Sequence, residues 1–520
     1  MRRGVLLALA ALVACTPDAP DTPFDVLILN GIVYDGTTDP ATQRNIGVRG
    51  GLIVKTGASP DAAATTVIDA AGLLVFPGFI DPHTHAPTDA ADLEATAHRN
   101  FLTQGITTVV VGNDGRGVPQ RDATFAALDR EGSGTNIAFF AGHGTIRKAV
   151  MALADRAPDA AELDTMRRMV ADELKAGALG LSTGLFYAPG SYAATDEVVE
   201  LARVAAEMGG IYDTHLRDEG SYNIGVVAAV EEAIDVGRRA GLPVHISHIK
   251  ALGTDSWGLS RNIIAVIDAA RADGIDVTAN QYPWVASNTR LASALVPRWV
   301  MAGTPDEMRT RLRDPSLEDR IRGEMTANLG RRGGPGAMLI TSRDSEWHGR
   351  TLEEIARVLE LDPIAAAIEI VLSEDPSIAS FVMNQDDIDR LRVQPWLMTG
   401  SDGGDGHPRF FASYPKAWRD FVVDRPLLSA ERFVNSSTGQ VADTLRLCSR
   451  GYIREGYAED IAVIDPETFL PHATFEEPYR LSTGVDYLLI NGDIVIDDAE
   501  FLGTRAGRVL RGNQVRCSRD

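Results

Sequence analysis

The middle of this 520-residue chain alternates short apolar segments with segments of helical pattern. Helical patterns such as 160–176 and 222–240 lie between the apolar segments. The eight apolar segments that we interpret as strands end near His85, Asn113, His143, Thr183, His215, His248, Asn280 and Asp402. Eight strand–helix units predict an α/β fold, a (β/α)8 TIM barrel with a parallel sheet.

Metal-binding side chains are concentrated at these predicted strand ends. Four of the eight ends are histidines and one is an aspartate, although the whole chain has only ten histidines. Structural histidines scattered through a sequence would not cluster in this way. Since catalytic groups of a TIM barrel sit at the carboxyl ends of its strands, the pattern indicates a metal site there.

The first strand end carries two histidines, His83 and His85, after the apolar run 79–82. On an extended strand, side chains two residues apart point to the same face. Imidazole is the commonest metal ligand in proteins, so this pair supplies half of a metal site. Taken alone, the motif also allows a structural role for the pair.

Three further strand ends complete a hydrolytic site: His215 and His248 on strands five and six, and Asp402 on strand eight. A divalent metal lowers the pKa of its bound water to about 7, so hydroxide exists at neutral pH. Asp402 could take the proton from that water and pass it to the leaving amine. The alternative for Asp402 is a turn-forming aspartate before glycine.

The two ends of the chain are rich in short β patterns. Residues 24–78 contain several short apolar segments separated by Gly, Asn and Asp, and similar segments return in 451–520. We therefore expect a small β-sandwich built from both chain ends, flanking a barrel at 79–450. The stretch at about 285–345 predicts an insertion over the barrel mouth, either a lid or a purely structural excursion.

Residues 1–23 have the layout of an export signal. Arg2 and Arg3 precede an apolar run, 5–13, that is too short to span a bilayer, and Cys15 follows it. The segment 12–15 resembles a bacterial lipobox, which implies a lipidated Cys15, a short tether and a periplasm-facing lipoprotein of the cell envelope. By resemblance to Gram-negative sorting signals, Thr16 in place of an aspartate after the cysteine favours the outer membrane. A plain cleaved signal peptide is the alternative.

Net charge and hydropathy restrict the partners of the protein. The net charge of −22 argues against nucleic-acid binding, which needs basic surface. No other segment is long and apolar enough to cross a membrane, so any membrane contact would be through the lipid anchor. Besides Cys15 the chain has Cys448 and Cys517, which could pair in an oxidising compartment. No oligomeric state follows from the sequence.

Motifs spread over nearly the whole chain resemble a known family. The matching segments are 77–85, 105–113, 177–185, 215–219, 248–250, 282–284, 400–403 and 507–511. Together they are similar to the amidohydrolase superfamily and, within it, to the D-aminoacylase (N-acyl-D-amino-acid deacylase) group. The resemblance implies a metal-dependent amide hydrolase that releases a D-amino acid from an N-acyl-D-amino acid, with zinc in one or two positions.

The resemblance also implies roles for individual residues. It places His83, His85 and Asp402 at one metal position, with His215 and His248 at the other. The residues implied to hold substrate, chiefly through its carboxylate, are Tyr187, Lys250, Arg409 and Ser287 or Asn288. A guanidinium fork and an ammonium suit a carboxylate, although Lys250 and Arg409 could instead form surface salt bridges.

Three departures from the family pattern are visible. Asp114 stands where the family has a cysteine ligand, and a carboxylate there could bridge two cations and make Mn or Co plausible beside Zn. Alternatively, Asp114 only caps a turn. Many amidohydrolases bridge their two metals with a carboxylated lysine at the end of strand four. Here the fourth strand, 181–184, has no lysine, so we expect no such bridge. The loop between Asp402 and Arg409 is shorter than in the family.

The other histidines have weaker arguments. We expect His143 to be structural or to support a ligand. His245 lies three residues before His248, which on a continuous strand would place it outside the barrel. His98, His348 and His472 carry no chemical argument.

Two other functions remain open from the sequence. The same site would suit a dipeptidase or a cyclic-amide hydrolase, although Lys250 and Arg409 favour a substrate with a free carboxylate. A lipid-anchored binding protein without catalysis is the non-enzymatic alternative, but pure binding would not need Asp402 as a proton shuttle.

Overall fold

The computed structural model describes residues 22–512 and contains a closed parallel barrel. Its strands are β8 (Phe79–Asp81), β9 (Ile106–Val111), β10 (Asn136–Phe139) continued by β11 (Ala141–Gly142), β12 (Gly180–Gly184), β13 (Ile211–His215), β14 (Val244–Ile246), β15 (Val277–Gln281) and β19 (Leu397–Thr399). Neighbouring strands pair in parallel, and a parallel bridge between Thr84 and Gly403 closes the ring. The predicted TIM barrel is confirmed.

Amphipathic helices cover the outside of the barrel. They include α2 (Arg121–Glu131), α3 (His143–Met151), α4 (Ala160–Lys175), α5 (Thr195–Glu207), α6 (Val226–Ala240), α7 (Ser260–Ala272), α14 (Gln385–Arg392), α15 (Arg409–Trp418), α16 (Ala430–Ser437) and α17 (Gly439–Leu445). The helix α4 starts at a capping box formed by Asp159 and Glu162. On α6, Val230, Ile234 and Val236 are buried, so its apolar stripe faces the barrel core.

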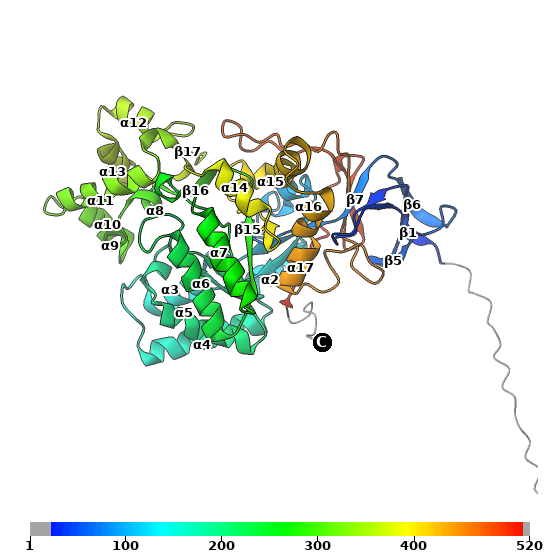
Figure 1. The fold of residues 1–520 in the computed structure, drawn as a ribbon, viewed down its shortest axis with the longest axis horizontal. Coiled ribbons are helices and arrows are strands. Elements are labelled where there is room, and N and C mark those ends of the chain that lie inside the picture. The colour runs from blue at the N-terminus through cyan, green and yellow to red at the C-terminus, as the bar shows by residue number, and fades with distance from the viewer. Residues whose placement is uncertain (1–21, 513–520) are drawn as a thin grey trace, which may run out of the picture.

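Both chain ends build a β-sandwich beside the barrel (Figure 1). One sheet has the order β5 (Leu52–Thr56), β4 (Ile46–Arg49), β1 (Phe24–Leu29) and β6 (Ala64–Asp69). The other has the order β23 (Glu500–Phe501), β22 (Asp493–Asp497), β21 (Val485–Ile490), β20 (Ile461–Ile464), β7 (Leu74–Pro77), β2 (Ile32–Val33) and β3 (Thr42–Gln43). Because β20 pairs with β7, hydrogen bonds join the two chain ends, as expected.

The insertion is a folded unit that is longer than the sequence indicated. Its antiparallel sheet has the order β16 (Ala286–Arg290), β18 (Ser377–Phe381) and β17 (Met338–Ile340). Its helices are α8 (Leu291–Leu295), α9 (Arg298–Met301), α10 (Pro305–Leu312), α11 (Glu318–Arg331), α12 (Leu352–Leu359) and α13 (Pro363–Ser373). The unit has its own apolar core, which includes Leu295, Met325 and Leu352. It extends to β18, past the expected end near 345, because β18 pairs with β16 at its start.

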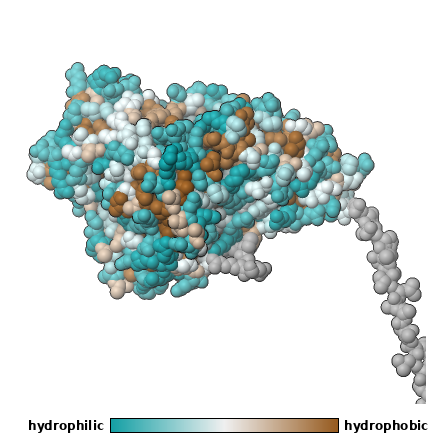
Figure 2. Space-filling view, viewed as in Figure 1, coloured by the Kyte–Doolittle hydropathy of each residue, from teal (hydrophilic) through white to brown (hydrophobic). Residues whose placement is uncertain are grey.

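The surface facing the viewer in Figure 2 is largely hydrophilic, with scattered apolar patches. Within residues 22–512, no helix is both long and apolar enough to span a bilayer. The predicted signal segment with Cys15, and Cys517 as a possible partner of Cys448, lie outside the described residues.

Candidate metal centre and active site

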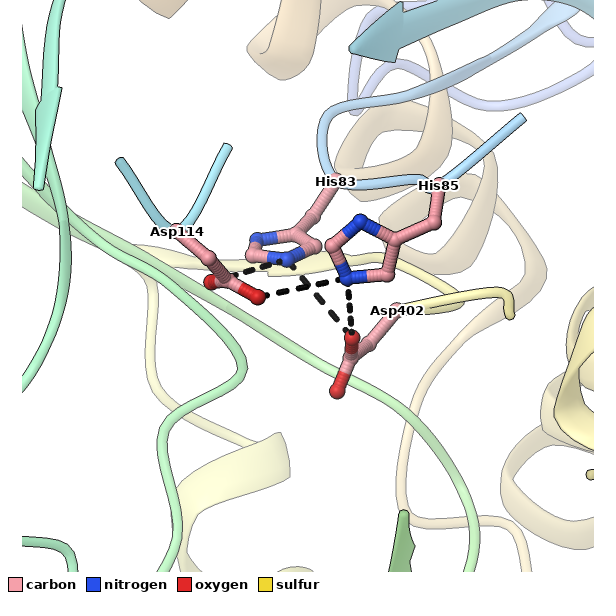
Figure 3. A group of neighbouring side chains, drawn as sticks. All are labelled: His83, His85, Asp114 and Asp402. Carbon is pink, nitrogen blue, oxygen red and sulfur yellow. Dashed lines mark ion pairs between the residues drawn. The ribbon is translucent and has the colours of Figure 1, made fainter. Parts of the chain in front are cut away.

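Six potential ligands meet at the carboxyl ends of the barrel strands. They form two groups that share Asp114: the first is His83, His85, Asp114 and Asp402, and the second is Asp114, His215 and His248. Within each group the ligand atoms lie within 4.8 Å of one another. Figure 3 shows the four side chains of the first group pointing toward a common point. The structure therefore brings together every residue that the sequence analysis named as a ligand.

The backbone fixes the ligands through contacts between neighbouring strand ends. The Asp402 N–H donates to the His83 carbonyl at 3.0 Å, and the His85 N–H donates to the Gly403 carbonyl at 2.8 Å. Asp114, His248 and Asp402 have φ angles of 58°, 34° and 49°, a left-handed conformation that side chains rarely adopt. Such backbone strain is concentrated at functional sites, where the surrounding fold holds it in place.

Asp114 lies between the two groups. Its Oδ1 is 3.4 Å from Nε2 of His83, 3.4 Å from Nε2 of His248 and 3.5 Å from Nδ1 of His215. Its other oxygen, Oδ2, is 3.2 Å from Nε2 of His85. A carboxylate in this position can bridge two cations, whereas a residue that only capped a turn would not contact all four imidazoles.

The donor set fits one or two divalent cations. Nδ1 and Nε2 of His83 and Nε2 of His215 are buried and have no hydrogen-bond partner among the described residues, which is costly unless a ligand satisfies them. Burial alone would raise the pKa of the Asp114 and Asp402 carboxyls. His83 beside Asp114 and Arg409 beside Asp402 nevertheless hold each pKa well below its usual range. Four imidazoles and two carboxylates are the nitrogen and oxygen donors that zinc accepts.

Glu219 is a buried carboxylate that contacts both the ligand His248 and Lys250. Its Oε1 accepts a hydrogen bond from Nζ of Lys250 and lies 3.0 Å from Nδ1 of His248. Burial would raise the pKa of Glu219, but the charge of Lys250 outweighs it and holds the pKa below its usual range. Glu219 lies within the family-like segment 215–219, but no role was predicted for it from the sequence. The available signal was an acidic residue four positions after a histidine ligand.

The residues expected to hold substrate line one cavity of about 530 Å³ above the ligands. Tyr187, Lys250, Ser287, Asn288 and Arg409 all contribute to its wall. Nη1 of Arg409 is 2.7 Å from Oδ2 of Asp402, so the short loop does bring Arg409 to the site. Both Lys250 and Arg409 are buried in ion pairs inside the cavity, which excludes the surface salt bridges considered above.

The prediction that His245 packs outside the barrel is wrong. His245 pairs in register with Asp213, which accepts a hydrogen bond from Asn113 across the barrel interior. Residues in register on parallel strands face the same side, so His245 also faces inward. The expectation assumed that side chains alternate between the two faces of the strand as far as His248. However, β14 ends at Ile246 and the backbone turns at His248, so this alternation does not relate His248 to His245.

His143 has a structural role, which was one of the two roles expected for it. Its Nε2 is 2.9 Å from Oε1 of Glu197, which also accepts from Nε of Arg147 at 3.0 Å. His143 belongs to neither ligand group. The fourth barrel strand, β12, carries no lysine.

Comparisons with known proteins agree with this site. The amidohydrolase family model matches residues 66–496. The chain is 34% identical to a D-aminoacylase of Alcaligenes xylosoxydans xylosoxydans, over 94% of this chain and 98% of that protein. It is 33% identical to an N-acyl-D-glutamate deacylase of the same organism, over 94% of this chain and 96% of the relative.

A solved structure extends the comparison to three dimensions. The N-acyl-D-glutamate deacylase of Bordetella bronchiseptica, complexed with zinc and a phosphonate mimic of the tetrahedral intermediate, superposes with a TM-score of 0.81. It is 33% identical, and the match covers 94% of this chain and all of that one. Together with the binuclear His/Asp site, these findings show that the chain belongs to the amidohydrolase family, as a metal-dependent member of its D-aminoacylase group.

Proposed function

We propose that this protein hydrolyses the amide bond of N-acyl-D-amino acids, releasing a carboxylic acid and a free D-amino acid. The observation that carries the proposal is the arrangement of Asp402, which faces His83 and His85 through one oxygen and Arg409 through the other. This arrangement puts a proton acceptor beside both the ligand group and a side chain suited to a carboxylate. The relatives named above are deacylases of this class.

The ligand residues have distinct proposed roles. With metal bound, His83, His85 and Asp402 would hold one position and His215 and His248 the other, and Asp114, which lies between the two groups, would be shared by them. A bound divalent cation, zinc or alternatively Mn or Co, would polarise the attacking water and the amide carbonyl.

Asp402 provides the proton transfer in this proposal. It accepts a proton from the attacking water while the oxygen of that water bonds to the acyl carbon. It then returns the proton to the amide nitrogen as the C–N bond breaks, so the amine leaves neutral. Arg409 and Lys250 hold the substrate carboxylate, and Tyr187 and Ser287 line its site.

The test is amine release from paired N-acetyl-D- and N-acetyl-L-amino acids by the zinc-loaded protein. Release from the D-series at a rate at least tenfold above the L-series supports the proposal. Equal rates, or hydrolysis of dipeptides in preference to N-acyl amino acids, would contradict it. Leucine and methionine pairs with neutral side chains avoid any effect of a second charge.

Replacing Glu219 by glutamine is expected to weaken zinc binding and lower kcat/KM, each by about 10- to 100-fold, because Glu219 orients both His248 and Lys250. Zinc affinity is measured by competition with a chelator, a readout that a merely structural role would not change. Glu232→Gln is the matched control: it breaks a comparable ion pair with Arg217 away from the ligands. A wild-type zinc affinity in Glu219→Gln would contradict this role.

We further propose that Cys15 carries a lipid that anchors the protein to the outer membrane of a bacterial cell envelope, facing the periplasm. The support is the segment 12–15 with Thr16 after it. In a Gram-negative host, the full chain should incorporate a fatty-acid label and sediment with outer membranes. Cys15→Ser should lose both properties. A wild-type chain that carries no label would refute the anchor.

A further inference from the structure

A second cavity of about 320 Å³ adjoins the catalytic cavity where the inserted unit meets the barrel loops. Phe186 and Ser293 line both cavities. Tyr222, Arg298 and Arg331 line only the second, and Arg332 lines the catalytic one. Arg298, Arg331 and Arg332 thus lie in the walls of two adjoining cavities.

Arg332 is the innermost of these groups. It is only 3% exposed, its Nε donates to the Tyr222 hydroxyl at 2.5 Å, and its Nη1 donates to Oγ of Ser287 at 3.1 Å. Both acceptors are neutral. Among residues 22–512 Arg332 forms no ion pair with a carboxylate, although Asp344 and Glu374 lie in the same cavity wall. A buried charge is normally paired, because burying it alone is costly.

Arg298 repeats this pattern in the second cavity. Its guanidinium carbon lies 4.3 Å from the centre of the Phe186 ring, and its Nη2 donates to the Ser293 carbonyl at 3.0 Å. Within the part of the chain that the structure describes, it has no carboxylate partner either. The acidic residue of that cavity, Glu324, already accepts from Arg320 and from the Trp299 indole. The positive charge on this wall is therefore uncompensated.

Arg332 also lies over the Tyr222 ring, 5.5 Å from its centroid, but a ring supplies no full negative charge. The end of helix α11 does not supply one either. The helix α11 ends at Arg331, and a helix C-terminus stabilises a nearby cation only modestly. The guanidinium of Arg332, however, donates to hydroxyls of β16 and of the loop after β13, away from the α11 carbonyls. These contacts orient Arg332 toward the cavity, and within the described residues they leave it without a counter-ion.

We propose that Arg332, with Arg298 beside it, forms a subsite for a second anionic group of the substrate, a carboxylate remote from the one held by Arg409 and Lys250. The inference rests on the proposed function for the identity of the substrate. A guanidinium held in place by two hydroxyls matches the planar geometry of a carboxylate. Two parts of an N-acyl amino acid can carry such a group: an acidic side chain, or an acyl part derived from a dicarboxylic acid.

The test measures binding separately from turnover. The Asp402→Asn substitution is expected to slow hydrolysis by about 10³-fold. On that background, calorimetry gives the Kd for each member of two near-isosteric ligand pairs in the zinc-loaded protein. N-acetyl-D-glutamate against N-acetyl-D-glutamine reports a side-chain carboxylate, and N-succinyl-D-leucine against N-(4-methylpentanoyl)-D-leucine reports an acyl carboxylate. We expect the dianionic member of one pair to bind at least tenfold more tightly, and which pair does so identifies the source.

Arg332→Gln should weaken binding of that dianionic ligand by roughly 100-fold and change the neutral ligands by less than about threefold. Arg322→Gln, on the helix α11 that precedes Arg332 but paired with Asp362 at the surface, is the matched control. If Arg332→Gln does not fold, Arg332→Lys should retain the charge preference and Arg298→Gln should reduce it. Equal binding within both pairs, or an equal loss for all four ligands, would overturn the subsite.

The two proposals fail in different ways. Hydrolysis of neutral N-acyl-D-amino acids without any charge preference would support the function and reject the subsite. Charge-selective binding that Arg332→Gln removes, without hydrolysis by the protein with Asp402 intact, would support the subsite and reject the function.

Discussion

Replacing Asp402 by asparagine is expected to lower kcat by about 10³-fold for N-acetyl-D-leucine. The substitution keeps the size of the side chain and one oxygen toward His83 and His85, but removes the group that accepts the proton. Zinc content should stay close to that of the wild type, since five of the six ligands are unchanged. Amine release and metal analysis by mass spectrometry on the same sample measure both effects.

The matched control for this substitution is Asp386→Asn, the same chemical change in the first turn of α14. It should leave kcat and zinc content at the wild-type values. If Asp402→Asn kept more than a tenth of the wild-type kcat while retaining zinc, the proton-transfer role of Asp402 would be wrong. A loss of zinc together with activity would instead make Asp402 chiefly a ligand.

Replacing Arg409 by alanine is expected to raise KM for N-acetyl-D-leucine by about 100-fold, because the guanidinium is the best match for the substrate carboxylate. A smaller fall in kcat should accompany it, since Nη1 of Arg409 also pairs with Asp402 at 2.7 Å. Steady-state kinetics on N-acetyl-D-leucine and on N-acetyl-3-methylbutylamine, which lacks the carboxylate, separate the two effects. KM for the second substrate should not change.

Arg419→Ala, at the residue that directly follows helix α15 and is paired with Asp424, controls for loss of an arginine from this region. Its KM values should equal those of the wild type. An equal rise in KM for both substrates in Arg409→Ala would show that Arg409 shapes the cavity and does not bind the carboxylate.

The sequence predicted the barrel and the convergence of the ligands because both depend on local order. Each strand has its own apolar run. The side chain at the carboxyl end of that strand lies at the open face of the barrel regardless of the conformation of the loops. His83, His215 and Asp402 could therefore be placed together without any knowledge of the contacts between them.

Features that depend on distant contacts could not be predicted in the same way. Glu219 acquires its role only when strand six brings His248 and Lys250 against it. Arg332 follows a surface-patterned helix, and its burial arises from the packing of the inserted unit on the barrel loops. His245 was misplaced because period-two alternation does not extend through the left-handed turn at His248.

The measurement that tests the account most directly is a zinc titration of the chelated protein, with metal content and release of D-leucine from N-acetyl-D-leucine followed in one sample. The account predicts that chelation abolishes activity and that one or two equivalents of zinc restore it. Alanine substitution of His83 or His248 should remove both the binding and the recovery. Full activity in the metal-free protein, or zinc bound at these residues without any hydrolysis of the amide, would contradict it.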